Sequence, residues 1–402
     1  MTLYLLALNP TDSVTEGFLP AAGRLGLDVV VLTEPGYAEA HRAVCRAMAR
    51  VEVLPCDVRD FHTVITRMST HRPPDAVFSN SDHLQTQTAL AAQYFGCHAK
   101  SWQAALRVKD KAEMRRWLSE AGADTVWSVE LAAGPDPAVS LAVMDVPFPC
   151  VVKPREGVAS EDVVRVDGLD ALVRCCREIR ERRPNDALLV EEFLPGQLFT
   201  LETLGDGGVR HVLAGFRTDL SQPPYFIEER LTYVAAHPEP VLAQVLAQLD
   251  ALGVGFGACH TEFVVHEGRA RLIEVNYRAI GDQCDLLLAE LLDIPLFELI
   301  LGVHLGDGLP PDLRARGDWA ARLDYPYARS AGTLTAAPEP VDQEVDQVRL
   351  TYRPFRGVGE RQPLHHTNRD LLGVVRAVGP GQEAVDRVVT GFLAAHRWEI
   401  TQ

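Results

Sequence analysis

The fold of this chain is decided by the stretch His260-Thr-Glu262-Phe-Val-Val-His-Glu-Gly268-Arg-Ala-Arg-Leu-Ile-Glu274-Val-Asn276-Tyr-Arg278. The pattern is typical of two short strands joined by a turn at Gly268. Side chains along a strand point to opposite faces in alternation. Glu274, Asn276 and Arg278 are therefore expected to project from one face, and the partner strand can place Glu262 beside them.

This arrangement depends on the register of the two strands. Glu262 and Glu274 share a face only if the connecting loop holds an odd number of residues. We expect a three-residue loop with Gly268 at positive φ. A two-residue turn would place the two glutamates on opposite faces of the hairpin.

Two carboxylates and an amide oxygen suit a hard cation such as magnesium, which keeps positions free for phosphate oxygens. A neighbouring arginine suits a phosphate or a carboxylate. The alternative is an ordinary antiparallel pair whose acidic residues face water. Asn276 and Arg278 on the same face as Glu274 favour a site.

Composition limits the class of protein. The chain has 402 residues, 47% of them hydrophobic, which is enough for two or three domains. Its net charge of −16 argues against binding to nucleic acid or to an anionic membrane. No apolar run is long enough to span a bilayer. We therefore expect neither kind of partner.

The eight cysteines form no CxxC pair. Residues 3–8 are apolar but lack a basic flank, so they are expected to form a buried strand rather than a secretion signal. We accordingly expect reduced thiols and a cytoplasmic protein.

Strand and helix patterns alternate through the first 108 residues, which predicts a parallel α/β layer. The expected strands are 3–8, 28–32, 51–55 and 76–78, and the expected helices are 17–25, 38–49, 61–70 and 86–94. The first turn, residues 9–17, is not GxGxxG, so a dinucleotide site is weakly supported.

Further along, a helix is expected over 109–121, and a strand ending in Lys153-Pro154 follows at 147–154. Lys153 can reach a phosphate, although a lone lysine at a strand end more often extends to solvent. The loop 155–162 is rich in small residues, and its backbone amides can cover phosphate groups. The strand 187–194 runs into a turn at Pro195-Gly196.

Other charged residues are weaker candidates. Lys111 lies near the start of a helix, and by itself it is typical of a solvated helix face. Arg217, Arg230 and Arg278 can bind a substrate carboxylate, although surface ion pairs are the more common role for the first two. His260 shares the face of Glu262 and can orient a ligand or accept a proton, or it is a structural histidine.

Taken in order, these motifs resemble the ATP-grasp family of carboxylate–amine ligases. The resemblance covers residues 1–305 and rests on Lys111, Lys153 with its loop, residues 191–194, Glu262 and Glu274-Val-Asn276-Tyr-Arg278. Residues 75–96, Asp110-Lys111, Met114-Arg115 and 370–379 are similar to bacterial amino-acid (dipeptide) ligases and siderophore-associated ATP-grasp proteins.

The resemblance implies a mixed α/β and α+β fold, in which a Rossmann-like domain precedes a two-lobed ATP-grasp unit. The implied regions are a Rossmann-like domain (1–108), a linker helix with a small lid lobe (109–188), a large lobe with the metal site (189–310) and a C-terminal subdomain completing the large lobe (311–402).

The resemblance also implies roles for individual residues. Nucleotide-binding residues are expected to be Lys111, Lys153, Ser160, Glu191, Glu192, Phe193 and Leu194. Glu262, Glu274 and Asn276 are expected to hold two magnesium ions, with manganese as an alternative. Lys153 and Arg278 are the expected catalytic residues, and Glu202, Arg217, Arg230, His260 and Arg278 are expected near the substrates.

The implied activity joins a small carboxylate, an amino acid or a citrate-like acid, to an amine through an acyl-phosphate, with release of ADP and phosphate. A natural-product or siderophore pathway and a homodimer are compatible with this resemblance. Two alternatives remain: a small-molecule kinase on the same scaffold and a catalytically inactive nucleotide-binding protein.

Overall fold

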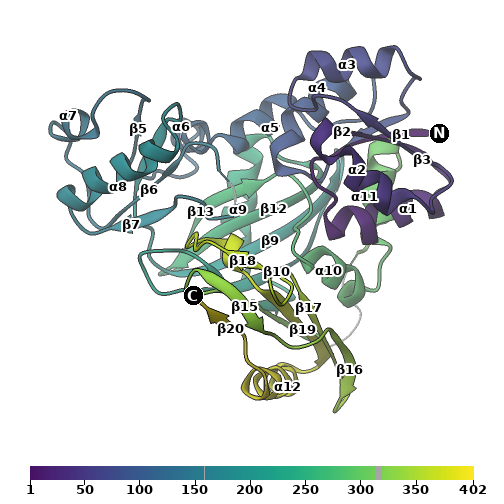
Figure 1. The fold of residues 1–402 in the computed structure, drawn as a ribbon. Coiled ribbons are helices and arrows are strands. Elements are labelled where there is room, and N and C mark those ends of the chain that lie inside the picture. Colours follow the sequence, from purple (N-terminus) through teal and green to yellow (C-terminus); the bar gives the residue numbers. More distant parts are fainter. Residues whose placement is uncertain (158, 314–318) are drawn as a thin grey trace.

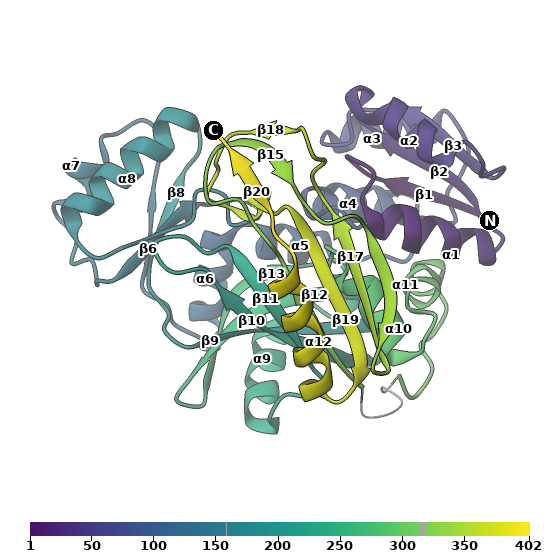
Figure 2. The same cartoon turned by 60° about the horizontal axis from the view of Figure 1, so that its bottom comes forward.

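The computed structural model describes residues 1–157, 159–313 and 319–402. An N-terminal domain and a small lobe lie at opposite ends of the molecule, and a large sheet occupies the centre (Figure 1). The same separation is visible after rotation, with the C-terminal part of the chain (yellow) toward the viewer (Figure 2). The expected mixed α/β and α+β class is confirmed.

The N-terminal domain is built on a four-stranded parallel sheet in the order β3-β2-β1-β4. Its strands are β1 (Thr2–Leu6), β2 (Asp28–Thr33), β3 (Val51–Pro55) and β4 (Ala76–Phe78), and its α-helices are α1 (Leu19–Arg24), α2 (Ala38–Cys45), α3 (Phe61–Ser69) and α4 (Gln85–Tyr94). Leu3 and Leu5 pack into one core cluster, whereas Tyr4 and Leu6 pack into another. The sheet is therefore buried on both faces, as a parallel layer requires.

Two helices, not one, connect this domain to the small lobe. They are α5 (Trp102–Lys109) and α6 (Lys111–Glu120). Asp110 separates them in an extended conformation, and its carboxylate accepts hydrogen bonds from the backbone N–H groups of Ala112 (3.0 Å) and Glu113 (3.2 Å). The expected helix starting at residue 109 is wrong in this respect, because Asp110 is an N-cap.

The small lobe is an antiparallel sheet in the order β5-β8-β6-β7, formed by β5 (Ser128–Leu131), β6 (Cys150–Pro154), β7 (Val164–Val166) and β8 (Leu188–Glu192). Helices α7 (Pro137–Leu141) and α8 (Leu169–Arg182) accompany it. The boundary expected after residue 188 differs from this arrangement, because it would cut β8 from the sheet in which it pairs.

A nine-stranded sheet forms the large lobe, in the order β13-β12-β9-β10-β11-β14-β19-β17-β16. Its strands are β9 (Gln197–Asp206), β10 (Arg210–Leu220), β11 (Glu228–Val234), β12 (Phe256–His266), β13 (Arg269–Asn276), β14 (Trp319–Asp324), β16 (Val341–Val345), β17 (Val348–Pro354) and β19 (Gly373–Pro380). The helices are α9 (Glu239–Leu252), α10 (Cys284–Leu292), α11 (Leu296–Leu305) and α12 (Gln382–Ala395). A separate small sheet contains β15 (Gly332–Ala336), β18 (Arg361–Gln362) and β20 (Glu399–Thr401).

The turn between β12 and β13 is one residue shorter than expected from the sequence. His266 pairs with Arg269, so the loop is the two-residue Glu267-Gly268, with both residues at positive φ (50° and 77°). That turn alone would put Glu262 and Glu274 on opposite faces. The register shifts at Ile273, however, and Glu262 lies directly opposite Glu274.

Ile273 is thus the extra residue of a β-bulge, which changes the parity of the hairpin. Before it, Leu272 packs into the apolar cluster that contains α9. After it, Glu274 and Asn276 face the opposite side, while Val275 returns to that apolar cluster. The bulge is what brings the acidic residues of the two strands onto one face.

Deleting Ile273 should leave Glu262 paired with Glu274. Removal of the extra residue makes Leu272 and Glu274 neighbours, and regular alternation keeps Leu272 on the apolar side and Glu274 on the cavity side. The measurement is the free energy of unfolding in urea. The deletion should cost about as much as Ile273→Ala, about 2–4 kcal/mol at most, so a much larger loss for the deletion would contradict this explanation.

No helix in the described parts of the chain is long and apolar enough to cross a membrane. All eight cysteines are free thiols, and seven of them are buried.

Candidate active site

A cavity of about 710 Å³ lies where the small lobe, the large sheet and the N-terminal domain meet. It is lined by most residues that the sequence singled out: Lys111, Lys153, Ser160, Glu191, Glu192, Phe193, Leu194, His260, Glu262, Glu274, Asn276 and Arg278. Residues separated by more than 160 positions in sequence therefore meet around one space.

One wall of the cavity is the polar face of β12 and β13. Glu262 lies opposite Glu274, and His260 lies opposite Asn276. Directly opposed residues of an antiparallel pair have Cβ atoms about 5 Å apart, so these side chains are within reach of a common ligand. Arg278 follows the end of β13, and its Nη1 donates to the Ala279 carbonyl oxygen (2.9 Å).

Lys111 joins this acidic wall to the start of α6. Its Nζ lies 2.7 Å from Glu274 Oε1 and 3.3 Å from the Gly157 carbonyl oxygen. Burial lowers the pKa of Lys111, but the Glu274 carboxylate outweighs burial and leaves that pKa raised. Lys111 is therefore a fixed positive charge beside the carboxylate pair.

Lys153 and Glu191 belong to a buried ion cluster at the junction of the two lobes. Lys153 Nζ lies 2.8 Å from Glu191 Oε2, and Arg115 binds both oxygens of the same carboxylate at 2.9 and 3.1 Å. Burial raises the pKa of Glu191, but Arg115 and Lys153 outweigh it and lower that pKa to about 2. Glu191 is accordingly ionised and fully occupied by protein partners.

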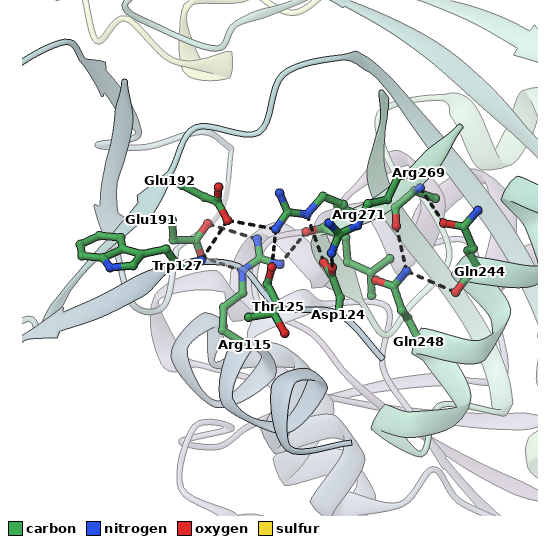
Figure 3. A network of polar contacts seen from close by, with 12 residues as sticks. Arg115, Asp124, Thr125, Trp127, Glu191, Glu192, Gln244, Gln248, Arg269 and Arg271 are labelled. Carbon is green, nitrogen blue, oxygen red and sulfur yellow. Dashed lines mark hydrogen bonds and ion pairs between the residues drawn. The ribbon is translucent and has the colours of Figure 1, made fainter. Parts of the chain in front are cut away.

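The end of β8 and the residues after it, 191–194, connect the small lobe to the large sheet and are called the hinge below. Figure 3 shows how the polar contacts continue along this hinge. Glu192 Oε1 accepts hydrogen bonds from the Trp127 backbone N–H and from Arg271 Nη2, both at 3.0 Å. Arg271 also donates to the Thr125 carbonyl oxygen. One oxygen of the Glu192 side chain is thus engaged at the hinge.

An apolar part of the cavity lies beside this hinge. It is formed by Val151, Val264, Ile273 and Leu198 together with Phe193 and Leu194. Phe193 stacks on Phe226 at a ring distance of 6.5 Å, and the guanidinium of Arg165 lies 4.6 Å from the Phe193 ring centre. Such walls suit a flat aromatic ligand.

The loop expected to cover phosphates follows β6 and borders the cavity. Ala159, Ser160 and Asp162 have φ near 56°, and residue 158 lies outside the described part of the chain. Asp162 binds Arg182 and Arg183, each at 2.6 Å. The loop also reaches the C-terminal region, because Ala159 O accepts from the Asn368 backbone N–H (3.3 Å).

His260 is held between two carboxylates. Its Nδ1 lies 2.7 Å from Glu202 Oε1, and its Nε2 lies 3.4 Å from Glu262 Oε1. Burial lowers the pKa of His260, but the two glutamates more than offset burial and raise that pKa to about 10. His260 is therefore protonated at neutral pH and has no lone pair with which to accept a proton. Glu202 itself lies behind His260 rather than on the cavity surface.

This ion pair should make stability depend on pH. An unfolded histidine has a pKa near 6.5, so the stabilisation from His260 is complete below about pH 6.5 and is lost as pH rises to about 10. The free energy of unfolding of the wild type minus that of His260→Asn should fall over this range. A difference that stays constant between pH 6 and 10 would contradict the assigned charge.

The sequence did not identify Glu228, Asp282 and Asn368, which also line the cavity. Burial and the nearby carboxylates of Glu262 and Asp282 raise the pKa of Glu228 to about 7. Asn368 Nδ2 donates to Glu228 Oε1 (2.9 Å), and the Glu228 backbone N–H donates to Asn368 Oδ1 (3.0 Å). These residues lack a motif, because 140 positions separate Glu228 from Asn368.

The structure does not bring Arg217 or Arg230 to this cavity. Arg217 is exposed and pairs with Asp219 (3.4 Å), and Arg230 pairs with Asp324 (3.1 Å) in a separate depression. Strand alternation explains the difference for Arg217, because its neighbour Thr218 is the residue that faces the cavity. Their expected role as substrate ligands is therefore corrected.

Residues 146–286 match the family model described as an ATP-grasp domain. This segment belongs to the ATP-grasp domain family. The matched segment contains β6, the hinge strand β8 and the complete acidic hairpin, so it covers the cavity walls described above.

Two relatives show how far the sequence similarity of the chain extends. An uncharacterized protein of Sinorhizobium fredii, y4rH, is 24% identical over 430 residues, covering all of this chain and 84% of that protein. The ATP-grasp enzyme fsqD of Aspergillus fumigatus is 26% identical over 204 residues, covering 48% of this chain and 34% of that protein.

The fold of the whole chain is similar to the crystal structure of an L-amino acid ligase from Bacillus licheniformis. The TM-score is 0.81 at 21% identity, with 100% of this chain and 99% of that chain covered. The N-terminal domain and the C-terminal strands are thus part of the fold shared with that ligase.

The oxygen atoms of the hairpin fit a magnesium ion. In the described part of the chain, no three His, Cys, Asp or Glu side chains are placed to hold a metal by themselves. The candidate donors are two carboxylates, Glu262 and Glu274, and the amide of Asn276. Magnesium is usually held by one or two protein carboxylates and takes its remaining oxygens from water and phosphate.

Proposed function

We propose that this protein is an ATP-dependent, ADP-forming ligase that joins a small carboxylate to an amine. One observation carries the proposal: two buried lysines, a directly opposed glutamate pair, Asn276 and Arg278 converge on one cavity. Positive charge, oxygen donors for a cation and a guanidinium are what transfer of a phosphoryl group to a carboxylate requires.

In this proposal the nucleotide base occupies the apolar part of the cavity beside Phe193 and Leu194. Lys111 and Lys153 neutralise its phosphates, and the loop containing Ser160 covers them. Glu262, Glu274 and Asn276 hold magnesium, which, when bound, neutralises phosphate charge during transfer. Lys111 is paired with Glu274 (2.7 Å) and therefore lies next to these donors.

An amine cannot displace oxide from a carboxylate, because oxide is a very poor leaving group. The carboxylate must therefore first be activated. Transfer of the γ-phosphoryl group to the carboxylate oxygen breaks the bond to ADP and forms an acyl-phosphate. Arg278 binds the charged oxygens of this intermediate, and the loop 155–162 keeps water away from it. Attack of a neutral amine on the acyl carbon then forms the amide and releases phosphate.

The acids that line the cavity favour an amino acid over a citrate-like substrate. Asp12, Glu228 and Asp282 are among the lining residues, and Arg278 is the single arginine among the described cavity residues. A tricarboxylate would need several cations, whereas a monocarboxylate with an ammonium group needs one arginine and one acid. A role in natural-product or siderophore biosynthesis stays a prediction.

The test is the product balance of the purified protein with ATP, magnesium and panels of amino acids and amines. ADP, phosphate and amide should form in equal amounts, and only when the acid and the amine are both present. AMP and pyrophosphate would contradict the proposal. A stable phosphorylated product without an amine would identify a kinase, and tight nucleotide binding without turnover would identify an inactive binding protein.

A further inference from the structure

The buried ion cluster Arg115–Glu191–Lys153 lies beside the proposed phosphate site. Its three side chains are 2%, 4% and 6% exposed, so water screens their charges little. Arg115 comes from α6, Glu191 from β8 and Lys153 from β6. Arg115 Nη1 also donates to the Leu272 carbonyl oxygen on β13 (2.6 Å), which joins the linker helix, the small lobe and the large sheet at one point (Figure 3).

The net charge of this ion cluster decides how much positive charge Lys153 can offer to the cavity. Two cations share one carboxylate, so the cluster has a net charge of +1. Arg115 engages both oxygens of Glu191, a geometry that a guanidinium matches and an ammonium does not. Lys153 shares one of these oxygens, and Lys153 is the member that lines the cavity together with Glu191.

We propose that Arg115 is a positioning residue for the nucleotide phosphates, acting through Glu191 on Lys153. By neutralising and orienting the Glu191 carboxylate, Arg115 leaves the charge of Lys153 available to the cavity. Without Arg115, Glu191 would neutralise Lys153 alone and hold it away from the phosphates. This inference rests on the proposed nucleotide site, and it adds a residue that does not itself line the cavity.

The test compares two ligands that differ only in phosphates. Binding of the magnesium complex of the nonhydrolysable analogue AMP-PNP and of adenosine is measured by calorimetry on the full-length protein. Arg115→Met should weaken AMP-PNP binding by about 10- to 100-fold, by analogy with the loss of an outer-shell partner that orients a metal ligand. Adenosine binding should change less than about twofold. Equal weakening of both ligands would mean a structural role and would overturn the proposal.

A double-mutant cycle with Lys153→Met separates action through Lys153 from an independent effect. In the Lys153→Met background, Arg115→Met should cause no further loss of AMP-PNP affinity. A loss of the same size in both backgrounds would overturn the proposal. If Arg115→Met does not fold, Arg115→Lys retains the charge but contacts one oxygen, and it should show the same phosphate-selective loss in reduced form.

These measurements do not depend on ligase chemistry. Wild-type protein that binds AMP-PNP but makes no amide would contradict the proposed function. The double-mutant cycle would still measure the coupling of Arg115 to Lys153 in AMP-PNP binding. Wild-type protein that binds adenosine and AMP-PNP equally well would overturn the role of Arg115, because Lys153 would then contribute nothing to phosphate binding.

Discussion

Replacing Glu274 with alanine is expected to abolish turnover. Glu274 lies opposite Glu262 and is the bridging acid between the proposed magnesium site and Lys111 (2.7 Å). Its loss removes a metal ligand, and we expect kcat/KM to fall by more than about 100-fold, beyond the usual effect of losing an outer-shell partner. The measurement is ADP release at saturating substrates over a magnesium titration.

The variant also leaves Lys111 as a buried charge without its carboxylate, so stability must be measured alongside activity. Glu274→Gln keeps an oxygen that accepts a hydrogen bond from Lys111 and should preserve most stability while remaining nearly inactive. Glu267→Gln, in the exposed turn of the same hairpin, is the matched control and should behave as wild type. Near-normal rates for Glu274→Ala at high magnesium would contradict the metal assignment.

Replacing Arg278 with lysine should lower kcat by about 100- to 1000-fold, the range found when a group that stabilises transition-state charge is removed. An ammonium keeps the positive charge but cannot bind two oxygens in parallel. Because Arg278 is assigned to the transferred phosphoryl group and the acyl-phosphate, the KM for ATP should change little. Steady-state kinetics with varied ATP measure this separation of kcat from KM.

Arg217→Lys is the control for this substitution. Arg217 is exposed, pairs with Asp219 and lies outside the cavity, so the same chemical change there should leave kcat within about twofold of wild type. A large effect at Arg217, or none at Arg278, would mean that the cavity is not where the reaction takes place.

The sequence predicted which polar side chains share one face of the hairpin, because these residues are close together in the chain. Glu274, Asn276 and Arg278 follow a period of two, which is a local property of a strand. Even here the local reasoning was incomplete. The turn has two residues instead of three, and a bulge at Ile273 restores the shared face that the turn alone would have removed. No residue pattern in the hairpin specified that bulge.

Contacts between distant segments were beyond such reasoning. Arg115 binds Glu191 across 76 positions, and Glu228 meets Asn368 across 140. Both pairs are set by the packing of α6 on the hinge and of the C-terminal segment beside β11. The exclusion of Arg217 and Arg230 has the same origin, because the orientation of a strand face is decided by the sheet on which it packs.

The amino-acid sequence by itself determined the mixed fold class, the parallel N-terminal layer and the acidic hairpin with its arginine, since periodicity and turn chemistry act over a few residues. Tertiary structure alone decided which charges meet. It placed Lys111 on Glu274 and Arg115 on Glu191, and it held His260 between two glutamates in its protonated form. The physical reason is that Coulomb interactions act between neighbours in space, and burial strengthens them where water is excluded.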